Sequence, residues 1–242
     1  MSDLSNPTPF LNGRFQDRRT GRKPGLFRDR RKGDRRKAAH WWKRPIDITV
    51  AIVAIVFFAP VFLLIALALL ISDGRPVFYR HKRLGKGGQS FDCLKFRTMR
   101  CDSDAILVRL LAEQPAIAEE WATTRKLSND PRIHRVGNIL RRSNLDELPQ
   151  LINVIKGEMS LVGPRPIVEA EVDLYGEGFF AYQAVRPGIT GLWQVSGRNT
   201  LTYETRVDLD ASYVKQLSLS NDLIILIKTV PIVLLAKGDY SK

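Results

Sequence analysis

A long apolar run over residues 46–71 is the feature that most limits what this chain can fold into. Asp47, Thr49 and Pro60 interrupt it, and at about 1.5 Å per residue it is long enough to cross a bilayer as a helix. Trp41-Trp42-Lys43-Arg44 precedes the run, and aromatic rings beside cationic groups are typical of an anchor at the membrane interface. The run therefore predicts a membrane helix.

The flanks of this run decide how it could sit in a membrane. The chain has a net charge of +13, and residues 1–44 hold fourteen Lys and Arg against four Asp. Lys and Arg next to a membrane segment favour the cytoplasmic side, and Pro60 removes a backbone hydrogen bond near the middle of the run. We therefore predict a re-entrant helix–break–helix hairpin over residues 41–72, broken near Pro60, with a kinked span as the alternative. The downstream flank is also basic, with Arg75, Arg80, Lys82, Arg83 and Lys86.

Residues 1–40 form an Arg-rich arm without any apolar period. A near-tandem repeat, Asp29-Arg30-Arg31-Lys32-Gly33 followed by Asp34-Arg35-Arg36-Lys37, lies within it. Such a composition cannot bury enough apolar surface to offset its ordering entropy, so we predict disorder. We favour attraction to anionic membrane lipids, at about 1 kcal/mol per basic residue. Binding of nucleic acid and a solvated tail are the alternatives.

The remaining residues, 73–242, are predicted to form a cytosolic catalytic domain that is mostly α-helical with a small β-hairpin. Two short extended segments, 76–79 and 91–99, flank a glycine-rich turn. Lys95 and Arg97 alternate along the second segment and so share one face, which suggests an anion site. The two cysteines of the chain are too few for a disulfide framework, and their spacing is not that of a metal site.

Three further segments of this domain are predicted to be helical. Residues 102–122 have apolar side chains at helical spacing, with Pro115 expected to kink or split the helix. Residues 167–182 are predicted to form a helix with acidic side chains along it. Residues 222–236 are apolar but too short to span a bilayer, which suits an interfacial helix or a core helix.

The stretch Arg141-Arg142-Ser143-Asn144-Leu145-Asp146-Glu147-Leu148-Pro149-Gln150 carries the densest set of reactive side chains. Because proline is tolerated only in the first turn of a helix, Asp146 is predicted to be the N-cap of a helix that Gly157 closes. Acidic residues in that position are most often caps. A cap needs only one carboxylate, however, and a helix N-terminus beside arginines is an anion site.

This arrangement suits an aspartate that attacks phosphorus. A carboxylate held at such a site stays ionised and close to a bound phosphate, as covalent aspartyl-phosphate chemistry requires. Attack of one anion on another needs neutralising charge, which Arg141 and a hard divalent cation on carboxylate oxygen would supply. The residues therefore suggest Asp146 as nucleophile and Glu147 as ligand of a divalent cation.

Two later motifs add cations and amides. Gly163-Pro164-Arg165-Pro166 presents Arg165 with little freedom, because the prolines restrict the backbone, and a guanidinium binds phosphate in a bidentate way. Residues 186–199 form a glycine-dense loop, in which Arg186, Gln194 and Arg198 would suit a nucleotide-sugar pocket. An ordinary irregular loop is the alternative for this segment.

Four ordered motifs together resemble one protein family. The chain is similar to the bacterial sugar transferases, the monotopic polyprenyl-phosphate phosphoglycosyl transferases, from about Trp42 to Tyr240. It most resembles the short members that start exopolysaccharide repeat units. The motifs that carry the resemblance are FDCLKFRTM at 91–99, LDELPQ at 145–150, KGEMSLVGPRP at 156–166 and RPGITGLWQ at 186–194.

The resemblance implies a reaction and roles for named residues. The family transfers a sugar 1-phosphate from a UDP-sugar, here UDP-galactose or UDP-glucose, to undecaprenyl phosphate and releases UMP. Asp146 would be the nucleophile that carries the phosphosugar, Glu147 the Mg²⁺ ligand, and Arg141 and Arg165 phosphate contacts. A re-entrant helix broken at a proline, here Pro60, would hold the enzyme on the cytoplasmic face of the bacterial inner membrane.

A different class of function is kept as the alternative. A membrane-bound scaffold would bind nucleic acid or an anionic polymer through the arm of residues 1–40, whereas the enzyme would need anionic lipids and no nucleic acid. Loss of all function on deletion of the arm would favour the scaffold. The sequence leaves the sugar, the polysaccharide and homo-oligomerisation open.

Overall fold

A computed structural model describes residues 41–124, 127–197 and 200–234 of the chain. The chain divides into two units, Met1–Trp41 and Trp42–Lys242. The arm for which disorder is predicted, residues 1–40, lies outside the described residues. The account below therefore concerns the second unit.

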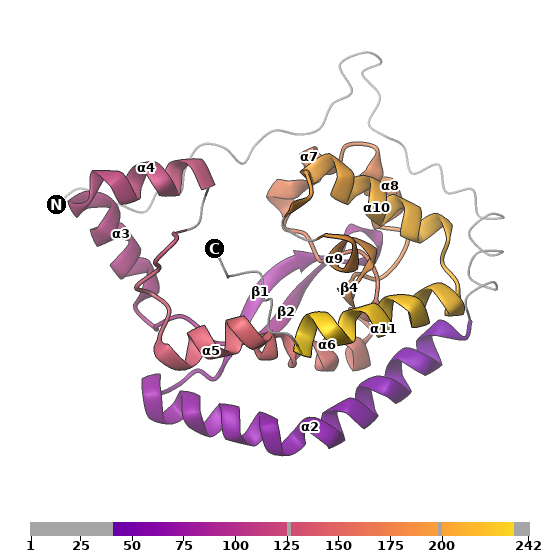
Figure 1. Ribbon diagram of the computed structural model, residues 1–242, viewed down its shortest axis with the longest axis horizontal. Coiled ribbons are helices and arrows are strands. Elements are labelled where there is room, and N and C mark those ends of the chain that lie inside the picture. The colour runs from indigo at the N-terminus through magenta and orange to yellow at the C-terminus, as the bar shows by residue number, and fades with distance from the viewer. Residues whose placement is uncertain (1–40, 125–126, 198–199, 235–242) are drawn as a thin grey trace, which may run out of the picture. The chain divides into compact units, whose positions relative to one another are not determined.

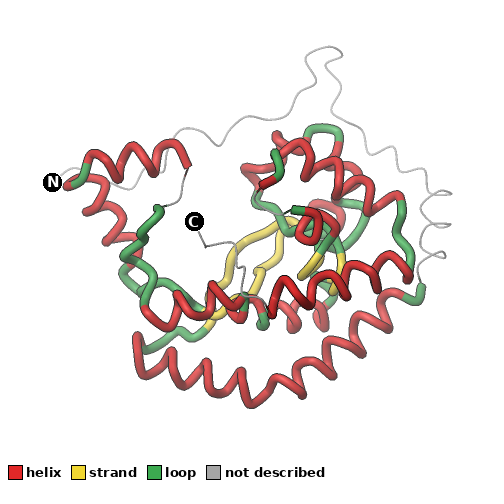
Figure 2. The backbone as a smooth tube through the Cα atoms, viewed as in Figure 1, coloured by secondary structure: helices red, strands yellow, loops and turns green. Residues whose placement is uncertain are grey.

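The second unit is mostly helical with a small antiparallel hairpin, as the sequence predicts (Figure 2). A second pair of strands, parallel and three residues each, had no signal in the sequence. The strands are β1 (Phe78–Leu84), β2 (Ser90–Phe96), β3 (Ser160–Val162) and β4 (Gly188–Thr190). The helices are α2 (Lys43–Asp73), α3 (Ser103–Glu113), α4 (Pro115–Thr124), α5 (Arg135–Ser143), α6 (Gln150–Lys156), α7 (Val172–Tyr175), α8 (Gly178–Tyr182), α9 (Leu192–Ser196), α10 (Tyr203–Lys215) and α11 (Leu219–Leu234).

Helix α2 covers the predicted membrane run and is continuous for 31 residues, with Pro60 inside it. It bends near its middle (Figure 1), so Pro60 does not separate two helices as predicted. Among the described residues α2 is the helix long and apolar enough to cross a membrane. Its length, its composition and its exposed apolar surface fit a membrane anchor. The most exposed of its apolar side chains are Val53, Val56, Phe57, Leu63, Leu64 and Ile71.

Polar contacts fix the first turns of α2 to the domain. Lys43 Nζ lies 2.5 Å from a carboxylate oxygen of Asp222 on α11, and the hydroxyl of Ser160 on β3 donates to Asp47 at 2.7 Å. Arg44 donates to the carbonyls of Val154 and Ile155 in the last turn of α6. A cation at the C-terminal end of α6 complements its dipole. The anchor is thus joined to α6, β3 and α11 at its N-terminal end.

The hairpin and α6 meet through one buried amide. Strands β1 and β2 pair antiparallel, with Tyr79 opposite Lys95. Fully buried Asn153 on α6 accepts from the Leu94 N–H at 2.9 Å and donates to the Asp92 carbonyl at 2.8 Å. These bonds pair backbone groups at the edge of β2, as buried backbone requires. The contact places the hairpin beside the segment that carries the two adjacent carboxylates.

Two predicted helices are interrupted in the structure. The segment 102–122 is split at Pro115 into α3 and α4, as the sequence allowed. The helix predicted over 167–182 is instead a 3-10 turn followed by the short helices α7 and α8. Gly176, between the two, has a φ of 49°, which ends α7. The prediction of one continuous helix there was wrong.

Candidate active site

The two adjacent carboxylates lie in a 3-10 turn, Leu145–Glu147, between α5 and α6. Asn144 ends α5 in the left-handed conformation, at φ 57°, and turns the chain toward them. Helix α6 starts only at Gln150, with Pro149 in the N-cap position. The prediction that Asp146 caps this helix was therefore wrong. Asp146 and Glu147 belong to a separate 3-10 turn that comes before the helix. Asp146 is left available for chemistry.

Lys95 on β2 reaches both carboxylates. Its Nζ lies 2.6 Å from Oε1 of Glu147 and 3.7 Å from Oδ2 of Asp146. The Lys95 side chain is one-fifth exposed and that of Asp146 only 6 % exposed. Little solvent screens the pair, so their interaction is stronger than a surface ion pair. The sequence predicted Lys95 at an anion site, and the structure gives it two carboxylate partners.

The environment of Asp146 perturbs its acidity. The pKa of Asp146 is raised to about 6, mainly by burial; the charge of Glu147 contributes to the rise, and the charges of Lys95 and Arg141 oppose it. Asp146 is thus mostly ionised at pH 7 but more basic than an ordinary aspartate. A carboxylate of this kind is a better nucleophile than one at its usual acidity.

Arg141 approaches the site from the last turn of α5. Its Nε donates to Oγ1 of Thr98 at 2.7 Å, and its charge lowers the pKa of Asp146. Thr98 is buried just beyond the end of β2. It fixes Arg141 near Asp146, and the pattern of charged residues in the sequence had not singled it out.

A small cavity next to Glu147 collects residues from four separate parts of the chain. Four of the predicted site residues, Lys95, Glu147, Arg165 and Gln194, line it together. The other six lining residues were not predicted from the sequence, and three of them have polar or ionisable side chains: Arg83, Cys93 and Gln150. Burial raises the pKa of the Cys93 thiol to about 11, so this thiol stays protonated at neutral pH and is a poor nucleophile. The remaining lining residues are Pro166, Gly188 and Ile189.

Arg165 is presented by a turn that is seated against the end of β1. Arg83 Nη1 donates to the Pro166 carbonyl at 3.2 Å, and the Leu84 N–H donates to the Ile167 carbonyl at 2.8 Å. The Arg165 guanidinium lies 5.6 Å from the centre of the Trp193 ring, within cation–π range. The sequence predicted a rigid arginine here from the prolines, but not these contacts.

Backbone packing explains the glycine that opens this turn. A Cβ on Gly163 would stand 2.5 Å from the carbonyl oxygen of Arg186, and a Cβ on Gly188 would overlap the Gly163 N–H. The two segments are adjacent because β3 pairs with β4. Close backbone approach between the segments therefore sets where Arg165 stands relative to the loop after β4.

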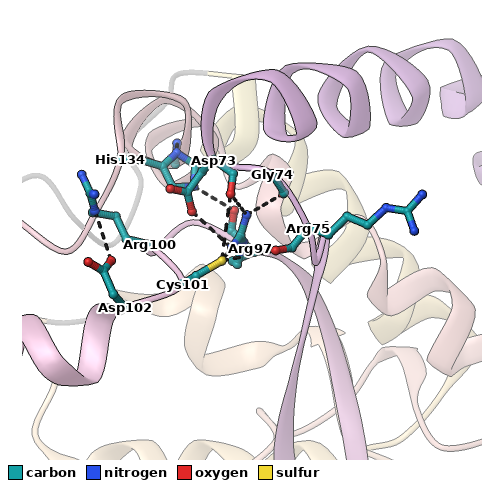
Figure 3. A network of polar contacts seen from close by, with 9 residues as sticks. Asp73, Gly74, Arg75, Arg97, Arg100, Cys101, Asp102 and His134 are labelled. Carbon is teal, nitrogen blue, oxygen red and sulfur yellow. Dashed lines mark hydrogen bonds and ion pairs between the residues drawn. The ribbon is translucent and has the colours of Figure 1, made fainter.

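The structure separates other predicted site residues from the cavity. Arg186 Nε donates to the Gly157 carbonyl at 2.7 Å, at the C-terminal end of α6. Arg97 turns away from Lys95 and contacts Asp73 and Gly74 at the end of α2 (Figure 3). Alternation placed it on the face of Lys95, but β2 ends at Phe96. Arg198 lies outside the described residues.

The carboxylates fit the predicted Mg²⁺ in their chemistry. Mg²⁺ takes oxygen ligands and is usually held by one or two carboxylates, with substrate phosphate and water completing its shell. Glu147 would supply such a carboxylate, beside Asp146 as the predicted nucleophile. Among the described residues no group of three or more His, Cys, Asp and Glu gathers as a protein-only metal site. Mg²⁺ held by Glu147 stays a prediction.

Comparison with known proteins identifies the family to which the chain belongs. The sequence pattern of the family described as bacterial sugar transferase matches residues 38–236. This chain belongs to the bacterial sugar transferase family. The match includes α2, the hairpin, both carboxylates and the turn of Arg165. The resemblance stated from the four motifs is thereby confirmed, and the chain is an enzyme of the phosphoglycosyl transferase class.

Named relatives within this family place the chain more closely. It is 53 % identical to the exopolysaccharide production protein ExoY of Rhizobium meliloti, over 82 % of this chain and 88 % of the relative. It is 47 % identical to the undecaprenyl-phosphate galactose phosphotransferase of Salmonella typhimurium, over 85 % of this chain and 43 % of that protein. It is 40 % identical to the UDP-glucose:undecaprenyl-phosphate glucose-1-phosphate transferase of Caulobacter vibrioides, over 82 % and 72 %. The chain is a sugar transferase of the exopolysaccharide-initiating type.

Proposed function

We propose that this sugar transferase moves a sugar 1-phosphate from UDP-galactose or UDP-glucose to undecaprenyl phosphate, releases UMP, and so starts an exopolysaccharide repeat unit. The observation that carries the proposal is the buried Asp146 beside Lys95 and Glu147, at 3.7 and 2.6 Å. Arginines line the adjoining cavity, as a pyrophosphate substrate requires. The named relatives act on both sugars, so the choice between galactose and glucose is left to the assay.

The first step is an attack on the phosphorus that bears the sugar. An Asp146 carboxylate oxygen forms a bond to this phosphorus, and the bond from it to the bridging oxygen of the pyrophosphate breaks. That oxygen leaves with its electron pair on UMP. The sugar 1-phosphate is then held on Asp146 as an acyl phosphate.

The second step returns the carboxylate. An oxygen of undecaprenyl phosphate bonds to the same phosphorus, and the bond to Asp146 breaks, which leaves a lipid pyrophosphate that carries the sugar. Lys95, Arg141 and Arg165 balance the charge that accumulates as anions meet. When bound on Glu147, Mg²⁺ would neutralise phosphate oxygens.

The acceptor lipid explains the anchor. Undecaprenyl phosphate lies in the membrane, and α2 would hold the site at the cytoplasmic face of the bacterial inner membrane, with its basic flanks on that side. A re-entrant path would keep both ends of α2 in the cytoplasm. Accessibility reporters fused to each end of the chain test this path. Reporters on opposite sides would establish a span.

The decisive experiment combines purified protein, Mg²⁺, a panel of UDP-sugars and undecaprenyl phosphate. UMP release and transfer to the lipid are expected with UDP-galactose or UDP-glucose, and neither is expected after Asp146→Asn. Glu147→Gln is the matched variant for the metal role and should raise the Mg²⁺ concentration needed for half-maximal rate. Normal turnover by Asp146→Asn would reject the covalent route. Activity that survives removal of residues 1–40 would reject the scaffold alternative.

A further inference from the structure

A buried arginine closes the C-terminal end of the membrane helix. Nη2 of Arg97 donates to the carbonyls of Asp73 at 3.0 Å and Gly74 at 2.8 Å, and Nη1 lies 3.2 Å from Oδ2 of Asp73 (Figure 3). The Arg97 side chain is 7 % exposed. The last carbonyls of a helix have no partner within it and carry its negative dipole end. Arg97 supplies both the donors and the positive charge that this end needs.

The same residue is joined to helix α5 through its backbone. His134 Nε2 lies 3.2 Å from the Arg97 carbonyl oxygen, and His134 Nδ1 accepts from the Gly137 N–H at 2.9 Å. One imidazole therefore caps α5 and holds it against Arg97. Gly137 packs so closely on Thr98 that a Cβ there would overlap the Thr98 carbonyl. Helix α5 is thus seated on the two residues that follow β2.

Thr98, the residue after Arg97, connects this region to the active site. Thr98 Oγ1 accepts from Arg141 Nε at 2.7 Å, and the charge of Arg141 acts on Asp146. The side chain of Arg97 therefore fixes the end of α2, while its neighbour fixes Arg141. If the end of α2 moved relative to β2, Arg97 would move with it. The adjacent residue, Thr98, would then shift the side chain of Arg141 beside Asp146.

We propose that Arg97 is a positioning residue for the lipid-dependent step. It fixes the position of the cytosolic end of the membrane helix relative to Arg141 and Asp146. The proposal rests on the two-step transfer above. The UDP-sugar reaches the site from solution, whereas the phosphate of undecaprenyl phosphate arrives at a height that the membrane helix sets. Loosening the end of α2 should therefore disturb the second step much more than the first.

Arg97→Lys tests this assignment, since lysine keeps the charge but cannot bridge two carbonyls and a carboxylate with a planar fork. Arg100→Lys is the matched control, because Arg100 is half exposed and pairs with Asp102 at the surface. Two rates are measured in the same preparation. The first is the burst of UMP without lipid, and the second is kcat/KM for undecaprenyl phosphate.

Arg97→Lys is expected to keep its UMP burst within about twofold and to lose about tenfold or more in kcat/KM for the lipid, since small misplacements of a reacting group have such effects. Arg100→Lys should match the parent in both. Equal losses in burst and lipid transfer, or an unchanged lipid step, would overturn the assignment. If the parent protein itself gives no burst, the two-step function fails, which is a separate result.

Two further variants guard against a folding defect. Asp73→Asn removes the ion pair but leaves the two carbonyl acceptors, so it should show the same selective loss to a smaller degree. Thr98→Val breaks the hydrogen bond to Arg141 directly and should lower both steps together. A Thr98→Val protein with a normal burst would show that the link from Arg97 to Arg141 does not reach the nucleophile, and the proposal would fall.

Discussion

Asp146→Asn should inactivate the enzyme and at the same time stabilise its fold. The carboxyl of Asp146 has a pKa of about 6 in the folded protein, mainly because it is buried, against an ordinary value of 3.8. Above pH 6 the folded chain must hold this carboxylate ionised where it is disfavoured. A difference of about two pH units corresponds to about 3 kcal/mol. Asparagine has nearly the same shape and carries no charge, so this penalty should disappear.

The pH dependence follows from the sign of the shift. Because the pKa is higher in the folded state, the destabilisation is fully present at pH 7.5 and fades as the pH falls from about 6 toward 3.8. The Asn variant should unfold at a higher temperature than the parent at pH 7.5, and the difference should be much smaller at pH 4.5 and nearly absent below the ordinary aspartate pKa of 3.8. Thermal unfolding in detergent micelles, followed by tryptophan fluorescence, measures this.

A surface carboxylate provides the control for this experiment. Asp92 is 44 % exposed and pairs loosely with Lys82 at 3.8 Å, so Asp92→Asn should shift the unfolding temperature little at either pH. An Asp146→Asn protein that is less stable than the parent at pH 7.5 would refute the argument. An equal gain at pH 7.5 and 4.5 would also refute it, because the gain would then not come from ionisation.

Three other predictions concern the residues around Asp146. Lys95→Met should raise the pKa of Asp146 and so move the acid limb of the pH–rate profile from about pH 6 to about pH 7 or higher. The reason is that a charge 3.7 Å away in a buried site is worth several kcal/mol. An unmoved limb would show that Lys95 does not set the acidity of Asp146. Gly137→Ala should lower the free energy of unfolding by about 2 kcal/mol or more through overlap with Thr98, measured by chemical denaturation; an unchanged free energy of unfolding would show that the contact with Thr98 yields. Burial lowers the pKa of His134, so its neutral ring should keep capping α5 as the pH falls through the ordinary histidine range and lose the cap only once it is protonated at lower pH; the protection of α5 amides against hydrogen exchange, relative to their intrinsic rates, should then drop, and His134→Asn, which keeps a cap, should remove that drop.

The parts of the site that the sequence predicted are those that depend on local chemistry. Asp146 and Glu147 stand out because two adjacent acids beside arginines indicate a phosphate site. Arg165 stands out because the prolines on either side restrict its backbone. The alternation of β2 put Lys95 on the right face, because the hairpin keeps its register as far as Phe96. The family match then gave the class of enzyme, and the roles of these residues stay predictions.

The parts that could not be predicted depend on contacts between distant segments. The parallel pairing of β3 with β4, which seats Arg165, involves strands too short to give a periodic signal. Arg97 obeys the alternation of β2 in sequence, yet the free carbonyls at the end of α2 offer it stronger partners than solvent does. Arg83 looked like one more basic flank residue, but its side chain is mostly buried and holds the Pro166 carbonyl.

Charge balance explains why so many cations converge on one aspartate. Asp146 and Glu147 together carry two negative charges, and Lys95 offsets one of them. A pyrophosphate that entered against this remaining charge would be repelled. Arg83 and Arg165 line the adjoining cavity, the charge of Arg141 acts on Asp146, and the Arg165 guanidinium lies at a distance from the Trp193 ring where a ring stabilises a cation. The cations beside Asp146 and Glu147 outnumber these two carboxylates, so the proposed nucleophile could stay buried and basic while the cavity still attracts an anionic substrate.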